Sequence, residues 1–144
     1  MARLSTDGID ELEKKLQAIS AGLRGQAVTD MLNAGGEVLK EAWINQIEAD
    51  HHVRTKAMRD NVSVSPVHFD GAGGYVEVYP TGTDSHRITN AQKAYILHYG
   101  RAPKKTGTKG IKGDRFVTKA EREARARATE VMQQKLNEYI AGKE

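Results

Sequence analysis

The sequence predicts an α+β fold in which a small antiparallel β-sheet packs against a long helix and a C-terminal helix. Apolar residues recur at steps of three and four before residue 50 and again after residue 118, as on the buried face of a helix. Between residues 62 and 80 they alternate instead, as on a half-buried strand. Because 144 residues is an ordinary length for one core, we expect residues 1–144 to form a single domain.

The first third of the chain has the spacing of two helices. A short amphipathic helix is predicted by four apolar residues at helical steps: Ile9, Leu12, Leu16 and Ile19. The glycines of residues 22–25 are expected to interrupt it, and a long helix should then cover about residues 26–49. Its apolar stripe contains Trp43, the one tryptophan of the chain. We interpret Trp43 as a core anchor rather than as a residue that stacks on a ligand.

The middle of the chain changes from helical to alternating periodicity. After one expected helical turn at Thr55–Asp60, the segments Val62–Phe69 and Tyr75–Pro80 predict two antiparallel strands. Pro66 lacks an amide hydrogen and therefore marks a sheet edge or a bulge. The glycine-rich residues 70–74 predict the hairpin connection between the strands.

Two further helices are expected in the second half. Asn90–Tyr99 predicts a helix that ends in a left-handed cap at Gly100, and Thr118 with Glu121 has the form of a capping box that opens the last helix. Gly142 is expected to end that helix. Five residues of the first of these helices are expected to face the body of the protein: Ala91, Ala94, Tyr95, Leu97 and His98.

Residues 101–113 predict a long mobile loop. They include five basic residues, three glycines and no acidic residue, so the segment has no apolar face to bury. Residues 1–72 carry a net charge of −3 and residues 73–144 a net charge of +6. Three interpretations of the loop remain open: contact with nucleic-acid phosphates, contact with an acidic face of a neighbouring subunit, or no role. The candidate contact residues are Arg101, Lys104, Lys105, Lys109, Lys112 and Arg115.

The sequence lacks the residue patterns of the common catalytic and metal sites. Without cysteine the chain has no disulfides, thiolate metal ligands or cysteine nucleophile, and its five histidines lack the spacing of metal ligands along a helix or strand. No phosphate-binding glycine loop and no nucleophile elbow occur. We therefore expect no enzyme, cofactor or metal, and with no long apolar run or signal peptide we expect a protein of the cytoplasm with no membrane contact.

Several short segments follow one another in a recognisable order: GIDELEKKL, VRTKAMRDNV, AYILHYG and FVTKA. Together they cover nearly the whole chain and resemble the small tail-completion, or head-tail joining, proteins of long-tailed bacteriophages and prophages. That family usually has a Thr-Gly-x-Leu-Arg-x-Ser-hydrophobic turn. The turn is matched here by four residues, with Lys56 at the usual glycine: Thr55, Met58, Arg59 and Val62.

A second family pattern, Tyr-Ala-x-x-x-Glu-Tyr-Gly, resembles the segment that contains Tyr95, Tyr99 and Gly100. The chain departs from the family at His98, where an acidic residue is usual, and at Arg115, where proline usually precedes the phenylalanine. Both departures lie at the ends of the basic loop.

The resemblance implies a structural protein of the virion neck, assembled in the host cytoplasm. Such a protein acts as a ring, expected to be hexameric, that joins the head connector to the tail. Its partners would be other copies of itself, the connector and the tail proteins, with DNA reached only as it passes through the channel. The residues alone leave a rival, a small nucleic-acid-binding protein that uses the basic loop and the arginine-rich face of the last helix. Against it, no aromatic residues are interleaved with the basic ones.

Overall fold

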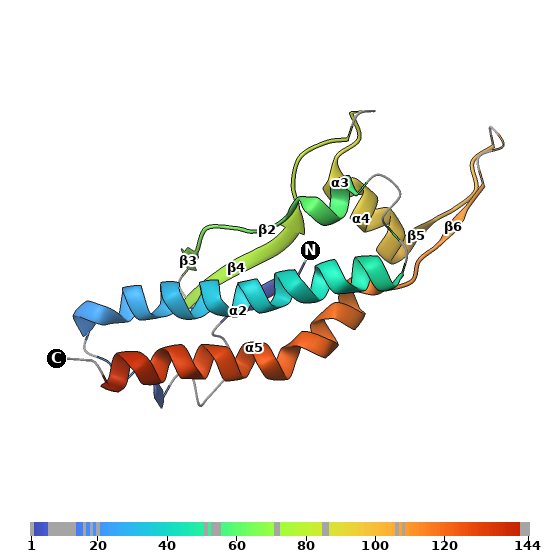
Figure 1. The fold of residues 1–144 in the computed structure, drawn as a ribbon. Coiled ribbons are helices and arrows are strands. Elements are labelled where there is room, and N and C mark those ends of the chain that lie inside the picture. Colours follow the sequence, from blue (N-terminus) through green and yellow to red (C-terminus); the bar gives the residue numbers. More distant parts are fainter. Residues whose placement is uncertain are drawn as a thin grey trace.

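The computed structural model has the predicted α+β architecture, with a small antiparallel sheet beside two long helices (Figure 1). It describes residues 2–5, 14–15, 17, 19, 21–50, 52, 56–70, 73–84, 87–105, 107 and 109–141. The helices are α2 (Ala21–Ala49), α3 (Ala57–Asp60), α4 (Asn90–Tyr99) and α5 (Phe116–Ala141). The strands are β1 (Ala2–Ser5), β2 (Val62–Val64), β3 (His68–Asp70), β4 (Gly73–Pro80), β5 (Gly100–Arg101) and β6 (Ile111–Lys112). None of these helices has an apolar stretch long enough to cross a membrane.

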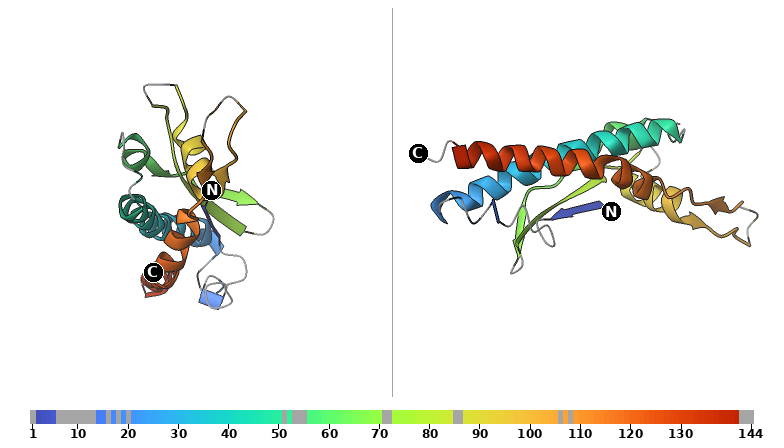
Figure 2. Two further views of the ribbon diagram at one scale, coloured as in Figure 1. Left: turned by 90° about the vertical axis from the view of Figure 1, so that its right-hand side faces the viewer. Right: turned by 90° about the horizontal axis from the view of Figure 1, so that it is seen from below.

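Helices α2 and α5 lie side by side and run in opposite directions, and α2 also packs against the sheet (Figures 1 and 2). Two groups of buried side chains fill the core between them. One group surrounds Trp43 and Phe116, whose rings meet edge to face at 5.5 Å, and the other surrounds Met31, Met132 and Val76. The long helix therefore carries the core that both the sheet and α5 complete, as its apolar stripe predicts.

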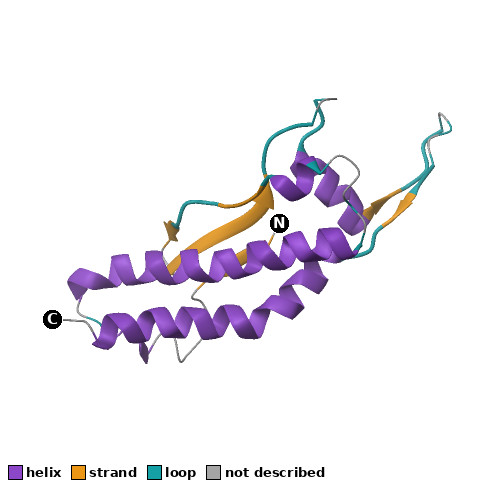
Figure 3. Ribbon diagram, viewed as in Figure 1, coloured by secondary structure: helices purple, strands orange, loops and turns teal. Residues whose placement is uncertain are grey.

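The sheet is built around β4, which pairs with β1 on one side and with β2 and β3 on the other (Figure 3). All pairs are antiparallel. Val64 lies opposite Val78 and His68 lies opposite Tyr75, so residues 65–67 oppose residues 76–77. This extra residue is a bulge at Pro66, as predicted, and the pairing of Asp70 with Gly73 makes the hairpin connection shorter than expected.

The N-terminal region differs from the prediction. Residues 2–5 form the strand β1, which the sequence analysis missed because four residues are too few to show alternation. Of the predicted helix at Ile9–Ile19, residues 14, 15 and 17 are helical, and most of the others lie outside the described residues. Helix α2 begins at Ala21 and not at residue 26, so the glycines of residues 22–25 form its first turns and do not separate two helices.

Helix α4 has the predicted bounds, with Thr89 accepting a hydrogen bond from the amide of Gln92. The predicted buried face of α4 is wrong at two positions: Ala91 and Tyr95 are exposed, whereas Ala94 and His98 are buried as predicted. Helix α5 begins at Phe116, so Thr118 lies inside the first turn and the predicted capping box does not open the helix. The predicted stop at Gly142 lies outside the described residues.

The segment predicted to be a long mobile loop contains a small β-hairpin. Strands β5 and β6 pair between α4 and α5, and the segment extends away from the body in the views of Figures 1 and 2. We call residues 100–113 the basic arm. Gly100 has φ +86° and ψ 179°, so it is an extended glycine conformation and not the predicted left-handed helical cap. A Cβ on Gly113 would lie 2.4 Å from the carbonyl oxygen of His98, which explains a glycine there.

Candidate functional site

The junction between α4 and α5 is held by polar side chains that bond the first amides of α5. The buried His98 accepts a 3.2 Å hydrogen bond at Nδ1 from the amide of Val117. Asp114 accepts a 3.1 Å hydrogen bond at Oδ1 from the amide of Phe116. Amides in the first turn of a helix have no partner within the helix, so these two side chains act as its cap.

The environment of His98 favours its neutral form. Burial lowers the pKa of its imidazole, and the positive charge of Arg115 lowers it further. A neutral imidazole can accept a hydrogen bond at one nitrogen, which is what the amide of Val117 requires. At this position His98 is therefore a structural residue of the junction.

A second polar cluster lies behind the junction and brings together Asp50, His52 and Asp114. One ligand atom of each residue lies within 4.8 Å of the others, an arrangement that the sequence spacing did not indicate. His52 Nε2 is 2.5 Å from Asp114 Oδ2, and Lys119 Nζ is 3.2 Å from Asp50 Oδ2. These are residue types that bind metal ions.

The charges in this cluster are already balanced by the protein. Although burial alone raises the pKa of Asp50, hydrogen bonds from Gln46 and Lys119 hold it below its usual range. A cation at this position would compete with Lys119 for Asp50 and with His52 for Asp114. The cluster therefore consists of the Lys119–Asp50 ion pair and the His52–Asp114 hydrogen bond, which tie the end of α2 to the start of α5.

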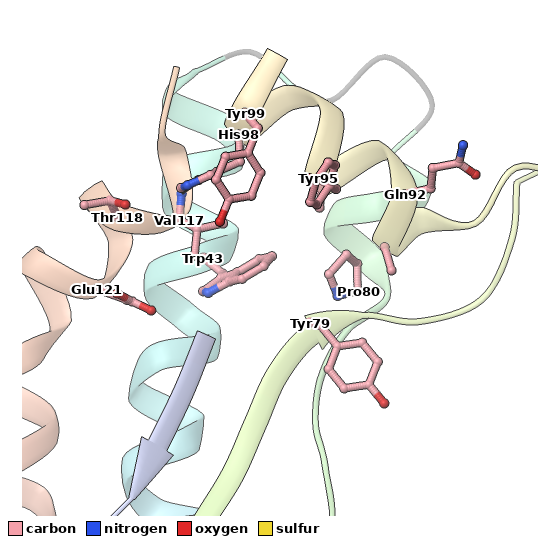
Figure 4. Close-up of a pocket in the computed structure, with 12 residues that line it drawn as sticks. Trp43, Tyr79, Pro80, Gln92, Tyr95, His98, Tyr99, Val117, Thr118 and Glu121 are labelled. Atoms are coloured by element: carbon pink, nitrogen blue, oxygen red, sulfur yellow. Dashed lines mark hydrogen bonds between the residues drawn. The ribbon is translucent and has the colours of Figure 1, made fainter. Parts of the chain in front are cut away.

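A groove of about 540 Å³ lies between α4, the end of β4 and the start of α5 (Figure 4). Tyr79 and Pro80 of β4 form one wall, and Tyr95 with other residues of α4 forms another. Val117 and Glu121 line it from α5. The walls are mainly apolar and aromatic, which is typical of a surface that binds a partner or ligand.

A buried polar group in this groove has no hydrogen-bond partner among the described residues. Trp43 is 1% exposed, and its Nε1–H donates no hydrogen bond. Figure 4 shows the nitrogen edge of this indole on the side of Glu121. Burial raises the pKa of the Glu121 carboxyl, although the amino terminus and Arg125 oppose the shift. An unpaired buried donor costs about 1–3 kcal/mol of stability, so a ligand that offers an acceptor to Trp43 Nε1 would be favoured. A positive charge on the same ligand would be attracted by the Glu121 carboxylate.

Exposed aromatic residues form the rim of the groove beside the basic arm. Tyr95 is 64% exposed and Tyr99 is 52% exposed, and their ring centroids are 4.7 Å apart. The guanidinium carbon of Arg115 lies 5.0 Å from the centre of the Tyr99 ring. Tyrosine and arginine are enriched in protein–protein contacts, and such rings also bind cations through their faces.

The structure places five of the six predicted contact residues on the basic arm: Arg101, Lys104, Lys105, Lys109 and Lys112. Arg115 lies at the base of the arm and contacts Tyr99. Trp43 is buried, as predicted, and packs against Phe116.

Sequence reasoning missed the groove itself. The helical spacing predicts that Tyr95 lies on the buried face of its helix, and the capping-box pattern predicts that Glu121 bonds the backbone at the start of the last helix. The four-residue step between Tyr95 and Tyr99, which places both rings on one face of a helix, was the available signal. Nothing in the sequence indicates that Glu121 would line the same groove as Trp43, which lies 78 positions earlier in the chain.

Comparison of the chain with models of protein families, with curated proteins and with solved structures gives no significant match.

Proposed function

We propose that this chain is a structural subunit of a tailed-phage neck, which forms a ring between the head connector and the tail. The observation that carries the proposal is the basic arm, which extends away from a body whose core is complete without it (Figures 1 and 2). Five positive charges with no acidic residue gain little from folding back on the subunit. An arm of this kind is suited to contact an acidic partner surface.

The turn before the sheet supports the resemblance on which the proposal rests. Lys56 stands where the head-tail joining family usually has glycine, and it has φ +60° and ψ −6°. This left-handed conformation favours glycine over residues with a Cβ. The unusual backbone therefore occurs at the position where the family pattern calls for glycine.

The proposal is tested in a phage that encodes this chain. Deleting its gene should give full heads and separate tails, counted by electron microscopy of lysates, and the wild-type gene supplied in trans should restore joined particles. The variant Lys104→Glu, Lys105→Glu, Lys109→Glu should fail to restore them, because it reverses the charge of the arm.

The matched control is Lys14→Glu, Arg122→Glu, Arg127→Glu, which makes the same charge change at exposed residues outside the arm. This control should restore joining. Joined particles without the gene contradict the proposed function. Joined particles with the arm variant contradict the role of the arm.

Nucleic-acid binding by the arm is the second candidate, favoured by its five basic residues. The exposed rings of Tyr95 and Tyr99 lie on α4 and not among those basic residues. A protein of this kind binds DNA with a Kd well below about 0.1 mM near physiological salt, tighter than nonspecific phosphate contacts alone. A titration of the purified chain with duplex DNA at several salt concentrations separates the two candidates.

A further inference from the structure

We infer that the groove beside α4 is the receptor for the basic arm of a second copy of this chain. In this contact the carboxylate of Glu121 accepts a hydrogen bond from a lysine of the incoming arm. The Nε1–H of Trp43 donates a hydrogen bond to a backbone carbonyl of the same arm. The inference rests on the proposed function and specifies the contact by which neighbouring subunits of the ring would recognise one another.

The polar groups of the groove and the arm are complementary. The groove presents the carboxylate of Glu121 and the Nε1–H of Trp43, and this N–H has no hydrogen-bonding partner among the described residues. The arm presents lysine side chains that are exposed at Lys104, Lys105 and Lys109, and its backbone supplies carbonyl acceptors. A lysine in the groove would also face the rings of Tyr95 and Tyr99, which attract cations.

The geometry favours a neighbouring arm over the subunit's own. The arm leaves the body at Gly100, directly after the helix that forms one wall of the groove, and then extends away from it (Figure 1). The pairing of Arg101 with Ile111 holds its base in that direction. A subunit of this shape therefore offers both halves of a contact at two separate places.

Contact between two different surfaces of identical subunits is a head-to-tail contact. Such contacts generate a closed ring when the rotation between subunits permits, and an open filament otherwise. Each subunit in a ring would give its arm to one neighbour and receive the arm of the other. The Nε1–H of Trp43 would then have an acceptor in every copy.

The test uses two full-length variants that each remove one half of the contact. The arm variant is Lys104→Glu, Lys105→Glu, Lys109→Glu, and the groove variant is Glu121→Gln, which removes the charge with little change of shape. Sedimentation velocity should show wild-type chains that associate with increasing concentration. Each variant alone should associate at least about tenfold more weakly, because one charged partner is missing.

Mixing the two variants provides the decisive measurement. The intact arm of the groove variant should enter the intact groove of the arm variant, which gives a 1:1 heterodimer and nothing larger. Trp43 is the one tryptophan of each chain, so its fluorescence should change when the heterodimer forms. Glu123→Gln, an exposed position on the same helix, is the control and should associate like the wild type.

Variants that associate like the wild type, or a mixture that stays monomeric, would overturn the inference. Binding of duplex DNA by a wild-type chain that does not self-associate would overturn it as well. The neck function is tested separately, by the counts of joined particles in lysates with and without the gene. Failure of the arm–groove contact is therefore distinguishable from failure of the neck function. Circular dichroism and melting curves establish that each variant is folded before its association is compared.

Discussion

The amide of Val117 donates a hydrogen bond to Nδ1 of His98, 19 residues earlier in the chain. This bond joins the end of α4 to the first turn of α5 across the whole basic arm. The arm therefore begins and ends at one fixed point, so its direction depends on the packing of the junction. Removing the acceptor with His98→Ala should cost about 1–3 kcal/mol of unfolding free energy, measured by urea denaturation, because a buried amide loses its partner.

The His98 junction should also make stability depend on pH. Burial and Arg115 lower the pKa of His98, so the unfolded chain takes up a proton at a pH where the folded chain does not. The contribution of neutral His98 to the free energy of unfolding is therefore complete above the ordinary histidine pKa of about 6.5. It is lost as the pH falls below that value. Melting curves between about pH 7.5 and pH 5 should show this loss in the wild type.

His98→Asn is the variant that isolates this effect, since its amide oxygen replaces Nδ1 without titrating. Its stability should fall less than that of the wild type over the same range. His68→Asn, at an exposed position, should leave the wild-type pH dependence in place. Equal slopes for wild type and His98→Asn would show that His98 is not the titrating group.

Trp43 should be among the most costly residues to truncate. Its ring is buried and meets Phe116 edge to face, and Phe116 in turn lies next to the rings of His52 and His98. Trp43→Ala should lower the free energy of unfolding by about 3–5 kcal/mol, measured by chemical denaturation. Trp43→Phe should cost less, because it retains much of the packing and removes the unpaired N–H. A Trp43→Ala variant with the wild-type melting temperature would contradict this account.

The fold was predictable wherever periodicity extends over many residues. The apolar stripe of α2, the alternation of β4 and the bounded helix α4 each contain their own signal. Short elements have no such signal, and β1 and the pair β5–β6 were therefore missed. Their pairing is decided by partners far along the chain or across a turn, which local sequence patterns do not contain.

The candidate site was predictable only in part, for the same physical reason. The basic arm is visible as a run of charges, so its residues could be named from the sequence. The groove is formed by α2, β4, α4 and α5 together, so no single segment indicates it. His98 shows this most clearly, because a buried imidazole that caps another helix looks in the sequence like any isolated histidine.

Two glycines of α2 should respond in opposite ways to the same substitution. A Cβ at Gly25 would have no atom within 4 Å, so Gly25→Ala should stabilise the protein by about 1 kcal/mol through helix propensity. A Cβ at Gly36 would lie 2.8 Å from Cγ1 of Val64, where the helix meets the sheet. Gly36→Ala should therefore destabilise by about 1–3 kcal/mol, and thermal melting of both variants checks the pair. Two shifts of the same sign would contradict this packing of α2 on the sheet.

The cluster of Asp50, His52 and Asp114 should not act as a zinc site. Zinc would have to displace Lys119 from Asp50 and separate His52 from Asp114, which are bonded at 3.2 Å and 2.5 Å. Equimolar zinc should leave the melting temperature unchanged, and isothermal titration should show no stoichiometric binding. A rise in melting temperature that His52→Ala abolishes would contradict this prediction.

The backbone conformation at position 56 should favour glycine over the native lysine. At φ +60° the steric strain of a residue with a Cβ costs about 1–2 kcal/mol of stability, whereas glycine adopts this conformation without strain. Glycine in turn loses more conformational entropy on folding, which offsets part of the gain. Lys56→Gly should therefore stabilise the protein by about 0.5–1 kcal/mol in denaturation experiments. Lys40→Gly is the matched control, because it makes the same change inside α2 and should destabilise by about 1 kcal/mol. If both variants lose stability, Lys56 does not have the left-handed conformation that the structure gives it.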